Sequence, residues 1–196
     1  AAALLKKQGH EVIGLHMKLY HGPENKSRQK SCCSLNEAID ASSACHSLGI
    51  PFYVLDYQKE FRDAVINYFI SEYSNGHTPN PCVMCNKKIK SDLLLKKVDE
   101  LDCDFLATGH YARIYNNPKN SRPQLARPKD LLKDQTYFLH GIQAHDLPRL
   151  MFPLAEIIKP EVRKIAGKLN LSTAKKLDSQ EICFVPRHSR GHKINP

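Results

Sequence analysis

The sequence predicts an α/β fold in which a parallel sheet carries helices on both faces, followed by a small hairpin and helical region. Two apolar runs of strand length, Glu11–Met17 and Pro51–Asp56, flank a segment with helical periodicity. A third run, Asp104–Thr108, follows two further helical segments. Strands that alternate with helices in this way form parallel sheets, because each crossover returns the chain to the same end of the sheet.

The helical segments have recognisable starts, stops and apolar faces. Residues 1–9 are typical of the last turns of a helix that Gly9 ends, so we expect a strand and a loop before Ala1. Ser34 and Glu37 form a capping box for a helix that Gly49 ends. The apolar positions predicted to face inward are Leu35, Ala38, Ile39, Cys45 and Leu48, then Phe61, Val65, Tyr68 and Phe69, then Leu94, Val98 and Leu101.

The pattern changes after Tyr111. Residues 112–115 and 124–127 flank a turn-rich stretch and predict a β-hairpin. A helix is predicted from about Pro160, with Val162, Ile165, Ala166 and Leu169 on its inner face. We therefore divide the chain into a truncated catalytic domain (1–147), the start of a second domain (148–186) and a basic, disordered tail (187–196).

The composition favours a polyanionic partner. The formal net charge is +9 and the isoelectric point is about 9.2, as in proteins that bind nucleic acid, although a basic balance can also serve solubility alone. Seven cysteines, an odd number, without an export signal favour thiol chemistry or metal binding over a disulfide scaffold. We expect a reducing compartment: the cytoplasm, or a mitochondrion or plastid in a eukaryote.

Residues 78–90 carry the clearest chemical signal. Two prolines precede a Cys-x-x-Cys pair, Cys82 and Cys85, which leads into lysines at a predicted helix start. A thiol near a helix N-terminus and ammonium groups has a lowered pKa, so Cys85 is a candidate nucleophile. The pair alone is compatible with a metal site, a redox pair or coincidence. A structural zinc site ranks below redox chemistry, because Cys32 and Cys33 are adjacent and no spaced histidine pair follows.

Other candidate residues are weaker when taken singly. Cys183 follows a polar stretch and by itself fits an ordinary core cysteine, as do Cys45 and Cys103. Lys133, Asp134 and Gln135 suit contact with a phosphate backbone and a base edge, or a solvated turn. In parallel sheets ligands bind beyond the carboxyl ends of the strands, which places three segments at one edge: 17–18, 56–57 and 108–110. In the last of these, His110 is a candidate hydrogen-bond donor to a phosphate group.

Taken together and in order, these segments resemble the tRNA-specific 2-thiouridylase family of the PP-loop ATP pyrophosphatase superfamily, whose fold is adenine nucleotide alpha hydrolase-like and Rossmann-like. The resemblance covers almost everything up to Pro186. The matching segments are residues 11–18, 49–54, 78–90, 107–113, 133–139, 152–154, 159–166 and 173–184.

The resemblance implies an ATP-dependent sulfurtransferase that 2-thiolates the wobble uridine of tRNA, with Mg2+, through an adenylated intermediate. A sulfur-relay protein or a cysteine desulfurase would supply the persulfide. The implied roles are nucleophile for Cys85, persulfide carrier for Cys183, disulfide formation between them, nucleotide contact for Met17 and Gly109, target-base contact for Asn80, Pro81 and Cys82, and tRNA contact for Lys133, Asp134 and Gln135.

The chain also departs from the family pattern. The phosphate-binding loop belongs before Ala1, and the C-terminal β-barrel and the usual continuation after Pro186 are absent, so this fragment is predicted to be inactive alone. Many members have Asp at position 82, and the Cys variant implies an alternative in which Cys82, Cys85 and Cys183 ligate an iron–sulfur cluster. Two other functions stay open: a non-catalytic tRNA-binding remnant, and another PP-loop thiolase or synthetase.

Overall fold

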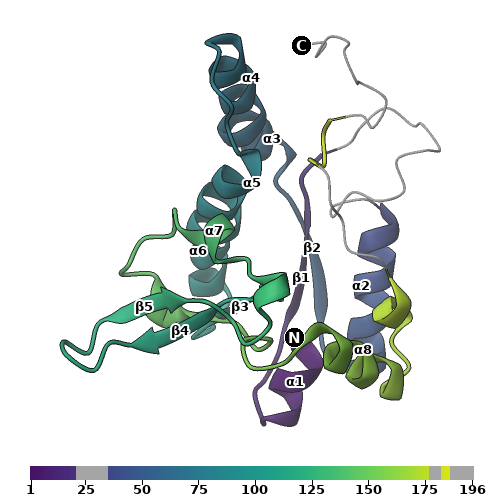
Figure 1. Ribbon diagram of the computed structural model, residues 1–196. Helices are drawn as coiled ribbons and strands as arrows, with labels where there is room; N and C mark the ends of the chain where they lie inside the picture. The colour runs from purple at the N-terminus through teal and green to yellow at the C-terminus, as the bar shows by residue number, and fades with distance from the viewer. Residues whose placement is uncertain (21–34, 177–181, 186–196) are drawn as a thin grey trace.

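Two parallel strand pairs and one hairpin organise the chain (Figure 1). The computed structural model describes residues 1–20, 35–176 and 182–185. The first pair joins β1 (Gly14–Lys18) to β2 (Phe52–Asp56), with Gly14 opposite Phe52 and Lys18 opposite Asp56. The second pair joins β3 (Leu106–Ala107) to β6 (Leu150–Met151). The predicted hairpin is confirmed as β4 (Arg113–Asn116) antiparallel to β5 (Pro123–Ala126).

Helices lie on both sides of the β1–β2 pair, which confirms the predicted α/β class. Figure 1 shows α2 on one side and the helices α3 to α6 on the other. The helices are α1 (Ala2–Lys7), α2 (Leu35–Leu48), α3 (Gln58–Phe61), η1 (Arg62–Ile66), α4 (Asn67–Ser74), α5 (Pro81–Met84), η2 (Cys85–Leu93), α6 (Leu94–Glu100), α7 (Thr136–Leu139) and α8 (Lys159–Lys168). Three 3-10 turns are η3 (Leu131–Lys133), η4 (Leu147–Arg149) and η5 (Ser172–Lys175).

Two predicted helix ends depend on glycine. Gly9 follows α1 with φ +92, and Gly49 follows α2 with φ +59. Both angles lie in the left-handed region, which side chains with a Cβ rarely adopt, so glycine ends these helices at low cost. Both predicted stops are confirmed, although Ser34 of the predicted capping box lies outside the described residues.

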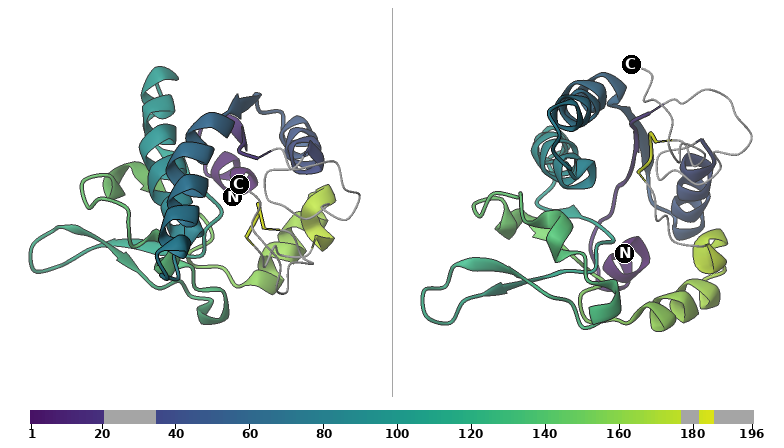
Figure 2. Two further views of the ribbon diagram at one scale, coloured as in Figure 1. Left: turned by 90° about the horizontal axis from the view of Figure 1, so that it is seen from above. Right: turned by 45° about the horizontal axis from the view of Figure 1, so that its top comes forward.

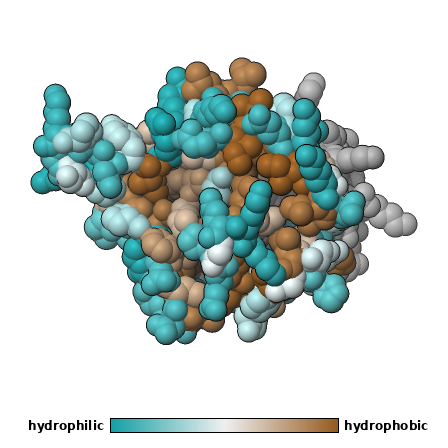
Figure 3. Space-filling view, turned by 90° about the horizontal axis from the view of Figure 1, so that it is seen from below, coloured by the Kyte–Doolittle hydropathy of each residue, from teal (hydrophilic) through white to brown (hydrophobic). Residues whose placement is uncertain are grey.

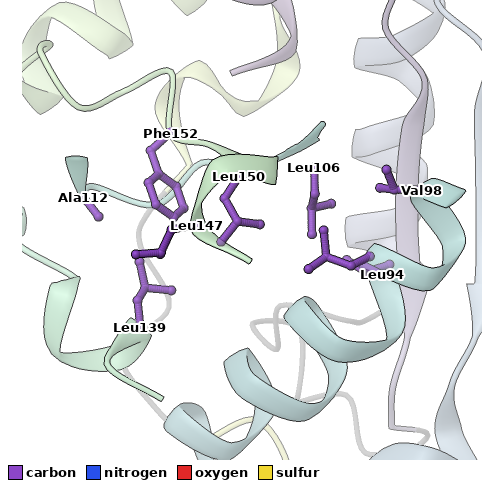
Figure 4. Close-up of a cluster of buried hydrophobic side chains, with 9 residues drawn as sticks. Leu94, Val98, Leu106, Ala112, Leu139, Leu147, Leu150 and Phe152 are labelled. Atoms are coloured by element: carbon purple, nitrogen blue, oxygen red, sulfur yellow. The ribbon is translucent and has the colours of Figure 1, made fainter. Parts of the chain in front are cut away.

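Two apolar clusters form the core. The first gathers side chains from α6, β3, η4 and β6, which point toward one another in Figure 4. Its buried members are Leu94, Leu95, Val98, Leu106, Ala112, Leu139, Leu147, Leu150 and Phe152. The second cluster consists of Leu19, Phe61, Val65 and Ile89. Met17 and Tyr57 pack against both clusters, so the carboxyl end of the β1–β2 pair joins them.

The structure differs from the sequence prediction in three details. The described strands form two separate parallel pairs instead of one ladder, because β3 takes its partner from Leu150–Met151. Ile39 is 58% exposed and Leu169 is 43% exposed, so placing them on inner helix faces was wrong. Leu169 is the C-cap of α8, where the chain has already left the helix face.

The surface also has distinct regions. The hairpin β4–β5 projects away from the remaining elements in both views of Figure 2. Seen from below, away from the carboxyl ends of β1 and β2, apolar side chains gather over the middle of the face inside a polar rim (Figure 3). Within the described ranges, no helix has the length and apolar character that crossing a membrane would require.

Candidate active site

Cys85 lies near the start of a long helical segment, as predicted. Pro81 occupies the first turn of α5, and the Asn80 side chain caps it by accepting hydrogen bonds from the amides of Cys82 (3.0 Å) and Val83 (3.4 Å). Cys82 is exposed, whereas Cys85 is half-buried one turn further on. The helix N-terminus therefore presents Cys82 to solvent and turns Cys85 toward the protein.

Cys183 lies in a short segment, residues 182–185, beside the carboxyl end of β1 (Figure 1). Its neighbour Phe184 packs edge-on against the rings of Phe61 (5.9 Å between centroids), Phe69 (5.5 Å) and Tyr20 (6.4 Å). Such edge-to-face contacts are favourable because the ring edge is positive and the ring face is negative. The aromatic contacts thus fix the residue next to Cys183.

The two cysteines that the resemblance pairs come to the same place. Cys85 and Cys183 are both half-buried and both pack against the second cluster. Neither forms a disulfide in this structure, and none of the other described cysteines does so (Cys45, Cys82 and Cys103). Cys32 and Cys33 lie outside the described residues. The expected disulfide is therefore not formed here, but both residues contact the same apolar cluster.

Cys45 and Cys103 behave as the core cysteines that the sequence predicts. Cys45 is buried on α2, and burial raises the pKa of its thiol. Cys103 packs against the first cluster. A buried thiol with a raised pKa is a poor nucleophile, so the position of Cys45 does not suit sulfur chemistry.

Two of the segments expected at the carboxyl edge, residues 17–18 and 56–57, lie side by side at the ends of β1 and β2. Met17 is half-buried at the end of β1, and the Lys18 ammonium pairs with the Asp56 carboxylate at 3.3 Å. Hydrogen bonds from the Gln58 amide and side chain are the main reason that the pKa of Asp56 is lowered. The Asp56 carboxylate therefore stays charged and holds the start of α3.

The segment from Thr108 to Tyr111 follows β3 and is tightly held. The His110 Nδ1 lies 2.7 Å from the Thr108 hydroxyl, and its ring packs edge-on against Phe152. Burial, with a smaller contribution from the Lys90 charge, lowers the pKa of His110 to about 3. His110 is therefore neutral at physiological pH and offers one N–H donor instead of a positive charge. A methyl group on Gly109 would meet only Leu154, at 3.9 Å.

The Lys133–Gln135 segment is braced by internal hydrogen bonds. The Gln135 side chain accepts from the Tyr111 amide (2.9 Å), while the Gln135 amide donates to the Tyr111 carbonyl (2.9 Å). The Asp134 carboxylate pairs with Arg127 at 2.6 Å and accepts from the Thr136 amide and hydroxyl. Burial raises the pKa of Asp134, but these hydrogen bonds outweigh it and lower the pKa. Gln135 thus links this segment to the loop that carries His110.

The three-cysteine iron–sulfur ligand set is not assembled. Over residues 1–20, 35–176 and 182–185, no three Cys, His, Asp or Glu side chains are grouped so that they could hold a metal ion. Cys82 is exposed at the helix start, whereas Cys85 and Cys183 pack against the apolar cluster. The three cysteines as arranged do not fit an iron–sulfur cluster.

Comparison with known proteins identifies the family of this chain. Residues 1–187 match the family model for the tRNA methyl transferase HUP domain. The chain belongs to this family. The tRNA-specific 2-thiouridylase MnmA of Natranaerobius thermophilus is 47% identical over 196 residues, which cover 97% of this chain and 53% of the relative. The protein of the same name from Caldicellulosiruptor saccharolyticus is 47% identical, over 99% of this chain and 54% of the relative. That from Geobacter metallireducens is also 47% identical, over 94% of this chain and 51% of the relative.

The chain therefore spans about half the length of the curated relatives it matches. The family match extends over every described element, from α1 to η5 and the segment of Cys183. The resemblance predicted from the sequence is confirmed at the level of the family, and the Rossmann-like α/β class is confirmed with it.

Two residues of this HUP-domain chain matter to the site and were missed in the sequence. Asn86, next to Cys85, is 4% exposed, and its side-chain amide donates to the Phe138 carbonyl at 3.2 Å. Lys176 pairs with two carboxylates on α2. Asn86 lies three residues before the buried Ile89, on the inner face of the helix, and this spacing was a usable signal. Lys176 offered no such signal, because its partners are far away in the sequence.

Proposed function

We propose that this chain carries the cysteine chemistry of an ATP-dependent tRNA-uridine 2-sulfurtransferase. One observation supports the proposal most: Cys85 and Cys183 pack against the same apolar cluster at the carboxyl end of β1. Relatives that share nearly half of its residues are named tRNA-specific 2-thiouridylases. Two cysteines that pack against one cluster beside the ligand edge of an α/β domain suit sulfur transfer to a base bound there.

The activation step would use ATP. ATP with Mg2+ would convert the C2 oxygen of uridine into an adenylate leaving group and release pyrophosphate, since an amide-like carbonyl is otherwise a poor electrophile. Met17 offers a half-buried thioether at the carboxyl end of β1. The backbone at Gly109 leaves room beside Leu154 for a ligand to approach closely. These two residues would contact the nucleotide.

The sulfur transfer would use both cysteines. A persulfide on Cys183 would attack C2 through its terminal sulfur, form the C–S bond and expel AMP. The Cys85 thiolate would then attack the Cys183 sulfur, so that the S–S bond breaks and its electron pair stays on the sulfur now bound to C2. A Cys85–Cys183 disulfide remains, and a thiol reductant restores both thiols. A sulfur-relay protein or a cysteine desulfurase would reload Cys183.

The charges of the chain support a tRNA substrate. The net charge of +9 favours binding to a polyanion. Lysines lie on η2 shortly after Cys85, at positions 87, 88 and 90, and Lys133 ends the 3-10 turn η3. The neutral His110 would donate a hydrogen bond to the substrate in place of a charge. Lys133, Asn80, Pro81 and Cys82 are proposed to contact the RNA.

Substitution of the two cysteines in the full-length protein tests this function. With tRNA, ATP and a persulfide donor, Cys183→Ser should abolish thiouridine formation and leave tRNA affinity unchanged, because phosphate contacts lie elsewhere. Cys85→Ser should accept sulfur but lose turnover, and Cys103→Ser is the matched control with full activity. Full thiolation by Cys183→Ser would refute the proposal, and tRNA binding without ATP consumption by the parent would favour the non-catalytic alternative.

A further inference from the structure

Lys176 connects the segment that leads to Cys183 with helix α2. Its ammonium lies 2.8 Å from a carboxylate oxygen of Glu37 and 2.5 Å from one of Asp40. Glu37 and Asp40 are three positions apart and therefore lie on the same face of α2. The Lys176 carbonyl also accepts a hydrogen bond from the Arg163 guanidinium of α8, at 3.2 Å. Both the side chain and the backbone of Lys176 are thus held.

This ion triad is partly removed from water. The side chains of Lys176, Glu37 and Asp40 are 34%, 22% and 32% exposed. Partial burial lowers the pKa of Lys176, but the hydrogen bonds from its ammonium to Asp40 and Glu37 outweigh this and raise the pKa. Two carboxylates around one ammonium at this exposure are screened less by salt than a pair at the open surface.

Cys183 lies between this triad and a second anchor. Lys176 precedes it by seven positions, and Phe184 follows it directly, in contact with the rings of Phe61 and Phe69. Glu37 and Asp40 lie on α2, on one side of the β1–β2 pair, whereas Phe61 and Phe69 lie on α3 and α4, on the other side (Figure 1). Lys176 and Phe184, which lie on either side of Cys183 in the sequence, are therefore each held by contacts of their own.

We propose that Lys176 is a positioning residue for sulfur transfer: its ion pairs with Glu37 and Asp40 hold the chain before Cys183 so that this thiol stays within reach of Cys85. The inference rests on the proposed function. Tethering a reactive group at both ends raises its effective concentration near its partner, because fewer conformations carry it away. Lys176 acts through the geometry of the chain.

The effective concentration of one thiol at the other is directly measurable. The protein is equilibrated with mixtures of reduced and oxidised glutathione, in which two thiols are oxidised to one disulfide and one glutathione disulfide is reduced to two glutathione thiols. The fraction with a Cys85–Cys183 disulfide is counted by mass spectrometry after alkylation. Lys176→Ala should lower the effective concentration about fivefold, Lys176→Arg should retain it, and the exposed Lys164→Ala on α8 is the control.

A mutant cycle separates positioning from general destabilisation. Glu37→Gln with Asp40→Asn should lower the effective concentration as much as Lys176→Ala, and the triple variant should lower it no further. Urea unfolding of each variant verifies that the equilibrium is measured on folded protein. An unchanged equilibrium in Lys176→Ala, or additive losses in the triple variant, would overturn the inference and leave the proposed function intact. A parent in which the two thiols never couple would overturn both.

Discussion

Cys85 and Cys183 pack against one apolar cluster, although the first lies near the start of a long helical segment and the second comes after the 3-10 turn η5, near the end of the described residues. Had each thiol been enclosed in a separate interior, no small movement could join them. Packing against one cluster places both cysteines in the same part of the fold. It also means that the packing of this cluster should control their chemistry.

Phe184→Ala tests that control. The Phe184 ring fits among Phe61, Phe69 and Tyr20, and its removal leaves a cavity beside Cys183. We expect a loss of about 3 kcal/mol in the free energy of unfolding, measured with urea, and faster alkylation of Cys183. Leu132→Ala, at a side chain 95% exposed, should change neither quantity. Alkylation of Cys183 at the parental rate would show that Phe184 does not hold it.

Asn86→Leu tests the connection between the Cys85 helix and α7. The substitution removes the hydrogen bond from the Asn86 side chain to the Phe138 carbonyl. A buried carbonyl left without its donor costs about 1–3 kcal/mol, so the free energy of unfolding measured with urea should fall by about that amount. Asn67→Leu on the exposed side of α4 is the matched control and should stay within about 0.5 kcal/mol of the parent. Equal effects at both sites would contradict a structural role for Asn86.

His110 predicts a dependence of stability on pH. Its pKa is about 3 in the folded chain, against 6.5 for an ordinary histidine, so below pH 6.5 the unfolded chain binds a proton that the folded chain does not. Folding is therefore fully favoured above that pH and weakens as the pH falls toward 3. Between about pH 7 and about pH 5.5 the contribution should fall by about 1 kcal/mol.

Urea unfolding of His110→Gln at the two pH values measures this contribution. The variant should lose less stability on acidification than the parent, by about 1 kcal/mol, whatever its stability at neutral pH. His46→Gln, at an exposed position on α2, should keep the parental dependence. The same dependence in parent and His110→Gln would mean that His110 titrates normally in the folded chain.

Local signals in the sequence predicted much of the fold and of the site. The hairpin was predicted from two short strands around a turn-rich stretch, and it was found at Arg113–Asn116 and Pro123–Ala126. The start of α5 also has a local signal, because Asn favours the N-cap position and Pro favours the first helical position, and Asn80 and Pro81 occupy these two positions. The same holds for the glycines that end α1 and α2. Features set by neighbouring residues were therefore recoverable.

Features set by distant contacts were not recoverable. The two-residue strand β6 is too short to show any periodicity, so its pairing with β3 could not be predicted. Ile39 has the helical spacing of a core residue, yet the fold leaves it 58% exposed. The π-helical turns of η1 and η2 were not predicted from the sequence. The pairing of Cys85 with Cys183 was implied by the family resemblance alone, since no spacing rule joins them.

Gly14 and Cys45 give a prediction about the packing of β1 on α2. A methyl group at Gly14 would overlap the Cys45 sulfur, which is buried on α2. Gly14→Ala should therefore lower the free energy of unfolding by about 1–3 kcal/mol, because neither the strand nor the helix can move freely. Cys45→Ala opens the space, so the double variant Gly14→Ala, Cys45→Ala should recover most of that loss. Urea titrations of the two single variants and the double variant give the coupling energy.

Gly167→Ala is the control for that cycle, because a methyl group there meets no atom within 4 Å and Gly167 lies in helix α8. Alanine in a helix is favoured over glycine by up to about 1 kcal/mol, so this variant should be as stable as the parent or more so. The two glycines differ in their surroundings, not in chemistry. Two results would contradict this explanation: a loss of stability in Gly14→Ala no greater than in Gly167→Ala, or a loss in Gly14→Ala that Cys45→Ala does not relieve. Either result would mean that the close approach of β1 to the Cys45 sulfur is not the reason for glycine at position 14.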